Sequence, residues 1–170
     1  MPARALPVKD KAIIALLVFF SLFAATLDLY FVWNAAVLES RVGRDWLADL
    51  WGIYADADRT WIVSPWSLGQ EVINVFLVTL LNVWLIVAIL RGAAYRHALQ
   101  LGLGSFLAYS VVLYYLVGHL SGYAGMKYRS PYTFSLFYGS ALPWLGGYLY
   151  FTWDSFVAIT RHFAAASGGR

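Results

Sequence analysis

The chain has 170 residues, of which 61% are hydrophobic, 18% aromatic and only 12% charged. This balance excludes a soluble globular domain and predicts an integral membrane protein, since the apolar runs approach the roughly 20 residues that a helix needs to cross a bilayer. Cysteine is absent, which excludes disulfide bonds and thiolate metal sites, and the net charge of +3 comes from basic residues scattered singly along the chain, which argues against a nucleic-acid partner.

Four apolar segments are predicted to be transmembrane helices, at residues 12–33, 68–90, 97–118 and 132–157. They are too rich in leucine and aromatic residues, and too well separated by polar joints, to be the alternating strands of a barrel. The first run is longer than the ~7 to 15 apolar residues of a signal peptide and lacks its cleavage pattern, so a retained helix is expected. The expected fold is all-α, a four-helix transmembrane bundle forming one domain over residues 1–170.

The first segment carries an acid, Asp28, near its end, and a long polar joint follows at residues 34–67. Tryptophan is enriched where a membrane protein meets water, so the joint is predicted to form an ordered, Trp-rich cap at the aqueous interface. Its tryptophans are Trp46, Trp51, Trp61 and Trp66, and they stand among Glu39, Asp45, Asp49, Asp56 and Asp58.

The second segment carries Glu71 close to its start. Helix one and helix two run in opposite directions, so at ~1.5 Å rise per residue Asp28 and Glu71 are expected ~7 and ~5 Å below the same membrane surface. An ionisable side chain in hydrocarbon costs at least ~2.5 kcal/mol, so the two carboxyl groups are predicted to form a functional site. Alternatively, Glu71 complements the dipole at the start of its helix, a role that the helix end occupied by Asp28 does not favour.

Ser67, Glu71, Asn74 and Asn82 fall on one face of the second segment, which is therefore expected to point into the bundle. An aromatic core tipped with carboxylates could hold a flat, greasy ligand that bears a cation or a developing positive charge. Interhelical hydrogen bonding and simple packing are the alternatives. The third and fourth segments are predicted to contribute Ser105, Tyr109, Tyr114, Tyr138, Ser140 and Trp144.

Other chemistry has little support in the sequence. His97, His119 and His162 lack the spacing of a zinc site, and the glycines of residues 102–104 lie within a span, where helix packing explains them better than phosphate binding. Neither a metal nor a cofactor is expected. The orientation of the chain in the membrane is predicted from its basic residues, because lysine and arginine are enriched on the cytoplasmic side. They gather at the side that holds both termini, which are therefore expected to be cytoplasmic. These residues are Arg4, Lys9, Lys11, Arg91, Arg96 and Arg161.

The chain resembles the emopamil-binding protein family, which shares an EXPERA-type membrane domain with the sigma-2 receptor. The similarity covers roughly residues 24–163 and rests on LADLWGIYADAD at 47–58, on Glu71, on a pattern over 98–122 and on SALPW at 140–144. It implies four core helices with cytoplasmic ends, in the endoplasmic reticulum or, in a bacterium, the inner membrane. The family's enzymes move a sterol double bond by protonation and deprotonation, and its receptor members bind sterols and hydrophobic amines.

The resemblance also implies roles for particular residues. Glu71 matches the family's essential helix-two acid and Asp28 its helix-one acid, an aspartate as in the sigma-2 branch. We therefore expect Asp28 and Glu71 to be catalytic, with a sterol-like or isoprenoid molecule and membrane lipid as partners and a homodimer allowed. The substrate-binding residues expected are Trp51, Tyr54, Asp58, Asn74, Tyr109 and Trp144.

Three departures bear on function. The sterol isomerases have histidine at Ala24 and threonine at Asn74, and their helix-four asparagine falls at Ser140 or Ala141, depending on where the extra Pro143 is placed. The isomerase proton shuttle is thus incomplete, although two acids in one low-dielectric site can divide donor and acceptor roles between them. The sequence predicts an isomerase-like protein acting on a sterol or polycyclic isoprenoid; the alternative is a non-catalytic, sigma-2-like binder of sterols or cationic amphiphiles.

Overall fold

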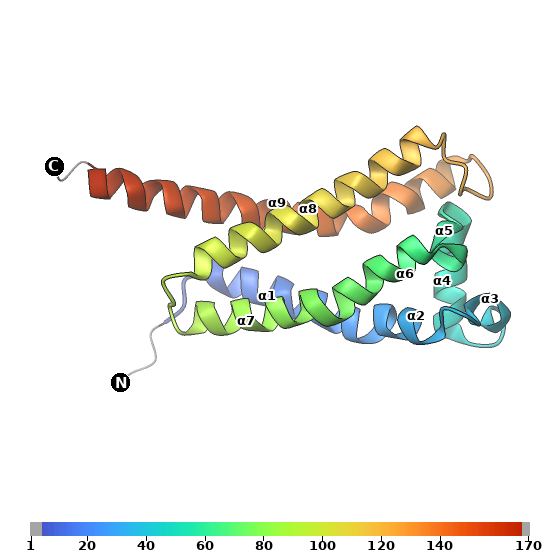
Figure 1. Cartoon of the computed structure of the whole chain (residues 1–170), viewed down its shortest axis with the longest axis horizontal. Helices are drawn as coiled ribbons and strands as arrows, with labels where there is room; N and C mark the ends of the chain where they lie inside the picture. The colour runs from blue at the N-terminus through green and yellow to red at the C-terminus, as the bar shows by residue number, and fades with distance from the viewer. Residues whose placement is uncertain (1–4, 168–170) are drawn as a thin grey trace.

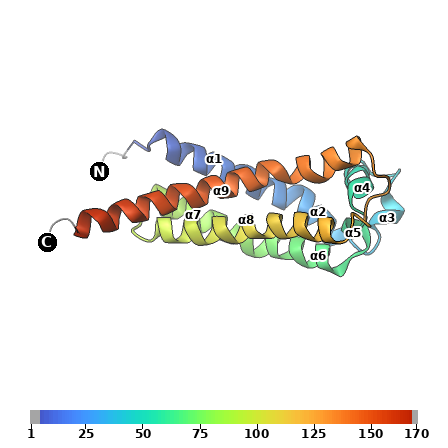
Figure 2. The same cartoon turned by 90° about the horizontal axis from the view of Figure 1, so that it is seen from above.

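The computed structural model describes residues 5–167, and every regular element in this range is a helix, which confirms the all-α prediction. Arg4, one of the residues used to predict orientation, lies outside the described range, as do the first and last residues of the predicted domain. Four rods lie roughly along the long axis of the molecule (Figures 1 and 2). They are α1–η1–α2 (Val8–Phe23, Ala24–Asp28, Leu29–Asn34), α6–η2–α7 (Pro65–Val72, Ile73–Val78, Thr79–Leu90), α8 (Arg96–Leu120) and α9 (Pro131–Ser167).

Three rods are long and apolar enough to cross a membrane: Val8–Asn34, Pro65–Leu90 and Arg96–Leu120. The protein is therefore a membrane protein, as predicted. The fourth rod, α9, is the longest at 37 residues, but tyrosines, glycines, serines and Pro143 make it less apolar. The sequence places the end of this helix at 157, whereas the structure continues it to Ser167 through a stretch of good helix formers that hydrophobicity does not mark.

Local chemistry sets the helix boundaries that hydrophobicity misses. The second rod begins at Pro65 instead of 68, because the Ser64 hydroxyl accepts a hydrogen bond from the Trp66 amide and proline suits the first helical position. The α8 helix ends at Leu120, and Gly122 follows with a φ of +59°, a left-handed conformation that glycine adopts without strain.

The joint between the first two rods contains α3 (Leu38–Arg41), α4 (Trp46–Ala57) and α5 (Thr60–Val63). Asp45 caps α4 by accepting a hydrogen bond from the Leu47 amide at 3.0 Å. This region packs through a small aromatic core that contains Phe31, Trp51 and Trp61. Two backbone hydrogen bonds and the Lys127–Asp56 ion pair, 2.9 Å between Nζ and Oδ1, tie it to the loop between α8 and α9.

The main core lies where α1 packs on α7 and α8 on α9, and its buried members include Leu17, Leu85, Leu103 and Phe151. The α8 and α9 helices approach closely at Gly104, where a Cβ would lie only 2.9 Å from the Tyr148 carbonyl oxygen. Small residues at such crossings allow close helix packing in membranes. The two helix pairs thus form two firmly packed units, between which a cavity lies.

Candidate functional site

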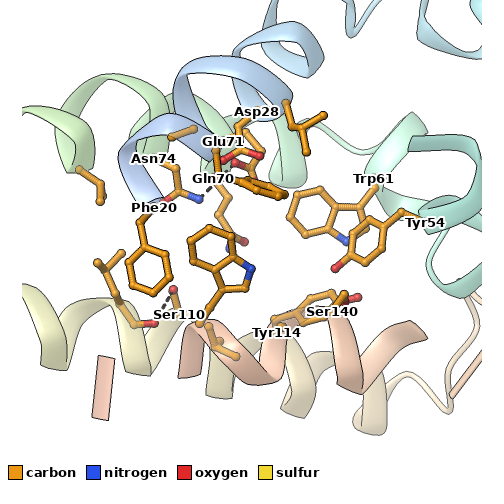
Figure 3. Close-up of a pocket in the computed structure, with 18 of the residues that line it drawn as sticks. Phe20, Asp28, Tyr54, Trp61, Gln70, Glu71, Asn74, Ser110, Tyr114 and Ser140 are labelled. Carbon is orange, nitrogen blue, oxygen red and sulfur yellow. Dashed lines mark hydrogen bonds between the residues drawn. The ribbon is translucent and has the colours of Figure 1, made fainter. Parts of the chain in front are cut away.

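The four rods, together with α4 and α5, enclose a cavity of about 290 Å³ whose walls are mainly aromatic and aliphatic (Figure 3). Asp28, from the first rod, and Glu71, from the second, lie in its wall with exposed fractions of 8% and 5%. Their side chains point toward one another. The two acids that the sequence places at matched depth therefore share one site.

Both carboxyl groups lie next to a π-helical turn. Ala24–Asp28 and Ile73–Val78 are π-helical, and the two segments contact each other across the helix pair. A π-turn holds one more residue than an α-turn and leaves the backbone hydrogen-bond ladder irregular; such turns are frequent at functional sites. Here the Thr79 hydroxyl donates to the Asn74 carbonyl at 3.2 Å, and the Thr26 hydroxyl donates to the Leu22 carbonyl at 2.7 Å. These turns re-aim Asp28 and Asn74 relative to a regular helix.

The hydrogen bonds around the pair position it without neutralising it. Asn74 Nδ2 donates to Glu71 Oε2 at 3.2 Å, and Trp51 Nε1 donates to the Leu27 carbonyl at 3.2 Å, next to Asp28. Among the described residues, no lysine, arginine or histidine forms an ion pair with either carboxyl group. A buried acid without a cationic partner is suited to hold a proton or to bind a positively charged group.

Four of the six predicted substrate-binding residues line this cavity: Trp51, Tyr54, Asn74 and Trp144. Trp144 packs against Phe20, with 4.3 Å between ring centroids, one residue after Pro143 interrupts the hydrogen bonding of α9. Burial raises the pKa of Tyr54 to about 12, so its hydroxyl remains a neutral hydrogen-bond donor at any physiological pH. The cavity therefore combines aromatic faces with a few polar groups.

Tyr109 is placed elsewhere, which corrects its assignment to the cavity wall. Its side chain is 62% exposed on the outer face of α8 and does not line the cavity. The residues of α8 that do so are Leu107, Ser110, Val111 and Tyr114, spaced by three and four, and Tyr109 lies on the opposite side of the helix. Ser105 and Tyr138 are also exposed and outside the cavity.

Asp58 is likewise not part of the carboxylate cavity. Its Oδ1 atom accepts a hydrogen bond from the Thr60 amide at 3.0 Å, at the start of α5, and the side chain lies against Gly125 of the loop between α8 and α9. It lines a second, smaller cavity of about 220 Å³. Its observed contacts are therefore structural, and they tie the end of α4 to the start of α5 and to this loop.

Several residues of the site were not among the six substrate-binding residues expected from the sequence, although Tyr114 was predicted to face the core of the bundle. Ser110 and Tyr114 have a readable signal, because they share a helix face with buried Leu107 and Val111. Gln70 also has one, because it lies four residues before Asn74 on the second rod, whereas Trp61 has none, since its position depends on packing against Phe31 and Tyr114. The part of the chain that the structure describes contains no cluster of three His, Cys, Asp or Glu side chains able to hold a metal ion.

Comparison with known proteins adds a family-level finding. A family model described as EXPERA, the expanded EBP superfamily, matches residues 46–155. The match includes Glu71, Asn74 and Trp144, whereas Asp28 lies before it. No curated protein matches the chain.

Proposed function

Because the chain belongs to the EXPERA family, the expanded EBP superfamily, we propose that it is an isomerase-like membrane protein acting on a sterol or another polycyclic isoprenoid. The family suggests a sterol isomerase-like or sterol-binding membrane protein. The observation that carries the catalytic proposal is the Asp28 and Glu71 pair, buried in an aromatic cavity whose described lining residues include no cation to neutralise it.

The proposed reaction needs one proton on the pair. A protonated carboxyl group donates its proton to one carbon of the ring alkene, and the alkene electrons form the new C–H bond, which leaves a carbocation on the neighbouring carbon. The other, ionised carboxyl group removes a proton from the carbon on the far side of the cation, and the electrons of that C–H bond form the shifted alkene. The double bond has moved, no oxidant is consumed, and the pair again holds one proton.

The surroundings support this chemistry. The carbocation would lie among the faces of Trp51, Trp144 and Phe20, whose ring electrons attract positive charge. The Asn74 amide holds Glu71 in place, so the carboxylate needs little reorganisation when charge develops. We assign proton transfer and cation stabilisation to Glu71 and the complementary acid or base role to Asp28.

The volume of the cavity bears on the substrate. At about 290 Å³ it lies at the lower end of the ~300–1,000 Å³ of small-molecule sites. The second cavity, of about 220 Å³, shares Trp61, Gln70 and Tyr114 with it. We propose that a polycyclic ligand fills the first cavity and reaches the wall between the two.

We also propose that all four rods cross the membrane. At ~1.5 Å per residue α9 is long enough to cross with a turn or more to spare, it packs along α8, and both chain ends lie toward the same end of the molecule (Figures 1 and 2). In this arrangement the termini are cytoplasmic and the joint of α3, α4 and α5 lies at the opposite surface. The membrane would be the endoplasmic reticulum in a eukaryote or the inner membrane in a bacterium.

A second candidate function is non-catalytic binding of sterols or cationic amphiphiles. Ala24 favours it, because this buried residue lines the cavity one helical turn before Asp28, where the isomerases have a histidine. Without that proton carrier, the pair would act only as a counter-ion for an amine.

The test is conversion of an 8-ene sterol to its 7-ene isomer by the purified protein, followed by mass spectrometry with chromatographic separation of the isomers. An isomerase predicts turnover that falls about 10²-fold or more in both Asp28→Asn and Glu71→Gln, while Asp154→Asn, distant from the cavity, retains it. No turnover, together with tight amine binding, favours the binder, and Ala24→His should then gain activity. Turnover that survives both cavity substitutions would reject the mechanism.

A further inference from the structure

We infer that Trp61 and Tyr114 form a second polar subsite of the cavity, one that binds a hydroxyl group of the ligand. The inference rests on the proposed function, since it concerns the same cavity and the same class of ligand. It adds a recognition element distinct from the carboxylate pair and makes the expected ligand bifunctional.

The first observation is two buried polar atoms that form no well-aligned hydrogen bond within residues 5–167, although the Tyr114 hydroxyl lies near the Tyr54 hydroxyl and the Trp61 indole. Trp61 Nε1 and the Tyr114 hydroxyl are inaccessible to solvent, and neither has a hydrogen-bond partner of acceptable geometry within residues 5–167. Trp61 as a whole is 6% exposed. Buried polar groups in proteins are almost always hydrogen-bonded, and an unpaired one carries the full penalty of its lost hydration. Two such atoms in one cavity wall point to a ligand that supplies the partner.

The second observation is their location. Trp61 and Tyr114 lie in the walls of both cavities, together with Gln70, so they separate the two spaces. Figure 3 shows them with Tyr54 and Ser140 at one side of the main cavity, apart from Phe20 and Asn74 at the other side. A ligand that contacts the carboxylate pair and extends toward α5 therefore meets these two side chains.

The third observation is that packing fixes both rings. The Trp61 and Tyr114 rings meet edge to face with 5.9 Å between centroids. Trp61 also packs on Tyr54 at 5.4 Å, and Tyr114 stacks on Phe137 at 4.6 Å. Rings held on several sides cannot turn their polar atoms toward water, so the subsite is preorganised.

The chemistry of the two atoms selects the ligand group. An indole N–H only donates a hydrogen bond, whereas a phenol hydroxyl both donates and accepts. A ligand hydroxyl satisfies both, because its oxygen accepts from Trp61 while its hydrogen is donated to Tyr114. No charged side chain lines this part of the wall on the main-cavity side, so an anionic or cationic group is not favoured. The ligand class is an apolar polycycle with a hydroxyl at one end and a positive or developing positive centre at the other.

The test compares two probes, a hydrophobic steroid carrying a tertiary amine and a hydroxyl at opposite ends, and the same amine without the hydroxyl. Their affinities are measured by displacement of a radiolabelled amine from the detergent-purified protein. The variants are Trp61→Phe and Tyr114→Phe, which remove the polar atoms but keep the rings. Tyr115→Phe is the matched control, because the Tyr115 hydroxyl donates to the Tyr138 carbonyl outside the cavity.

The unmodified protein should bind the hydroxylated probe about tenfold more tightly than the deoxy probe. Trp61→Phe and Tyr114→Phe should each lose most of this preference, because they bind the hydroxylated probe more weakly and the deoxy probe with unchanged affinity. Tyr115→Phe should keep the tenfold preference. Equal affinity of the unmodified protein for the two probes would overturn this inference but leave the proposed function standing. An equal loss of affinity for both probes in the variants would do the same, because it would show that the two rings contribute only packing. If the unmodified protein binds neither probe, the proposed ligand class fails and the subsite with it.

Discussion

The two ends of the bundle differ in whether their buried carboxyl groups have a cationic partner. Toward the chain ends, Asp10 is 3% exposed and receives two hydrogen bonds from the Arg96 guanidinium, at 2.8 and 3.0 Å. Toward the joint, Asp28 and Glu71 are buried almost as deeply, yet they face each other, and no cationic side chain of the described residues forms an ion pair with them. Burial alone therefore does not distinguish the candidate functional acids from a structural one; the lack of a cationic partner within residues 5–167 does.

The end of the bundle that holds the Asp10–Arg96 ion pair has the features of a structural clasp. At the same end, Asp154 Oδ1 forms an ion pair with Lys9 Nζ at 3.0 Å. Gln100 Nε2 donates hydrogen bonds to Asp154 Oδ2 and to the Phe151 carbonyl. These bonds connect α1, α8 and α9 at one end of the bundle. Buried polar atoms without a hydrogen-bond partner occur at both ends of the described bundle, at His97, Gln100 and Ser155 near the clasp and at Trp61 and Tyr114 in the cavity wall, and only the latter two face a cavity.

Breaking the clasp should have the largest effect on stability. Arg96→Met leaves the Asp10 carboxylate buried without its partner, and such a loss typically costs about 3–5 kcal/mol of unfolding free energy. Thermal or denaturant unfolding in detergent measures the effect. The double variant Asp10→Leu with Arg96→Met should recover most of the loss, because it removes the uncompensated charge. If the single variant is as stable as the unmodified protein, the clasp is not structural and the comparison between the two ends fails.

Asn74 gives an intermediate effect, on binding instead of folding. Asn74→Leu removes the amide that positions Glu71, so affinity for a hydrophobic tertiary amine should fall roughly tenfold, about 1.4 kcal/mol, with little change in melting temperature. Asn82→Leu is the matched control, because Asn82 on the same rod donates to Ser21 at 3.2 Å instead of to a carboxyl group. An equal loss of affinity in both variants would assign the effect to cavity shape.

The smallest effect expected concerns pH at the joint. Hydrogen bonds from the Tyr30 hydroxyl and from the start of α4 lower the pKa of Asp45 below its ordinary value of 3.8. A lowered pKa in the folded state means stabilisation that is present above the unfolded value and is lost as pH falls through the folded one. Melting curves should therefore show the unmodified protein losing its advantage over Asp45→Asn below pH 3.8. An advantage that persists unchanged at lower pH would show that the Asp45 charge is not involved.

The sequence predicts the helical fold and the second rod well, for a physical reason. Hydrophobic length and a polar stripe are local properties, and Ser67, Glu71 and Asn82 are buried as the helical period predicts. It fails for Tyr109, because an aromatic residue in a membrane helix can face lipid as readily as a cavity, and composition does not distinguish them. Only the spacing of Leu107, Val111 and Tyr114 reveals the correct face of α8.

The two π-helical turns could not have been predicted, and neither could the fold of the joint. Ala24–Asp28 and Ile73–Val78 have ordinary apolar sequences, so the extra residue per turn arises from packing between the rods. Trp61 lines the cavity where its ring packs against Phe31 and Tyr114, long-range contacts that no local pattern encodes. Asp58 was expected at the site because it matches a position of the family, and a match in sequence does not show whether an acid contacts a ligand or, as the Thr60 amide bond indicates here, supports the local fold.

The central claim is that the unpaired acids bind positive charge while the paired acid does not. It is tested most directly by the affinity of a hydrophobic tertiary amine for Glu71→Gln and Asp10→Asn, measured beside the unmodified protein, with unfolding curves for each. We predict that Glu71→Gln loses about 10²-fold or more in affinity and stays folded, since glutamine keeps the volume, whereas Asp10→Asn loses stability but binds normally where it remains folded. Unchanged affinity in Glu71→Gln would contradict the account and return Glu71 to the role of a helix-terminal acid.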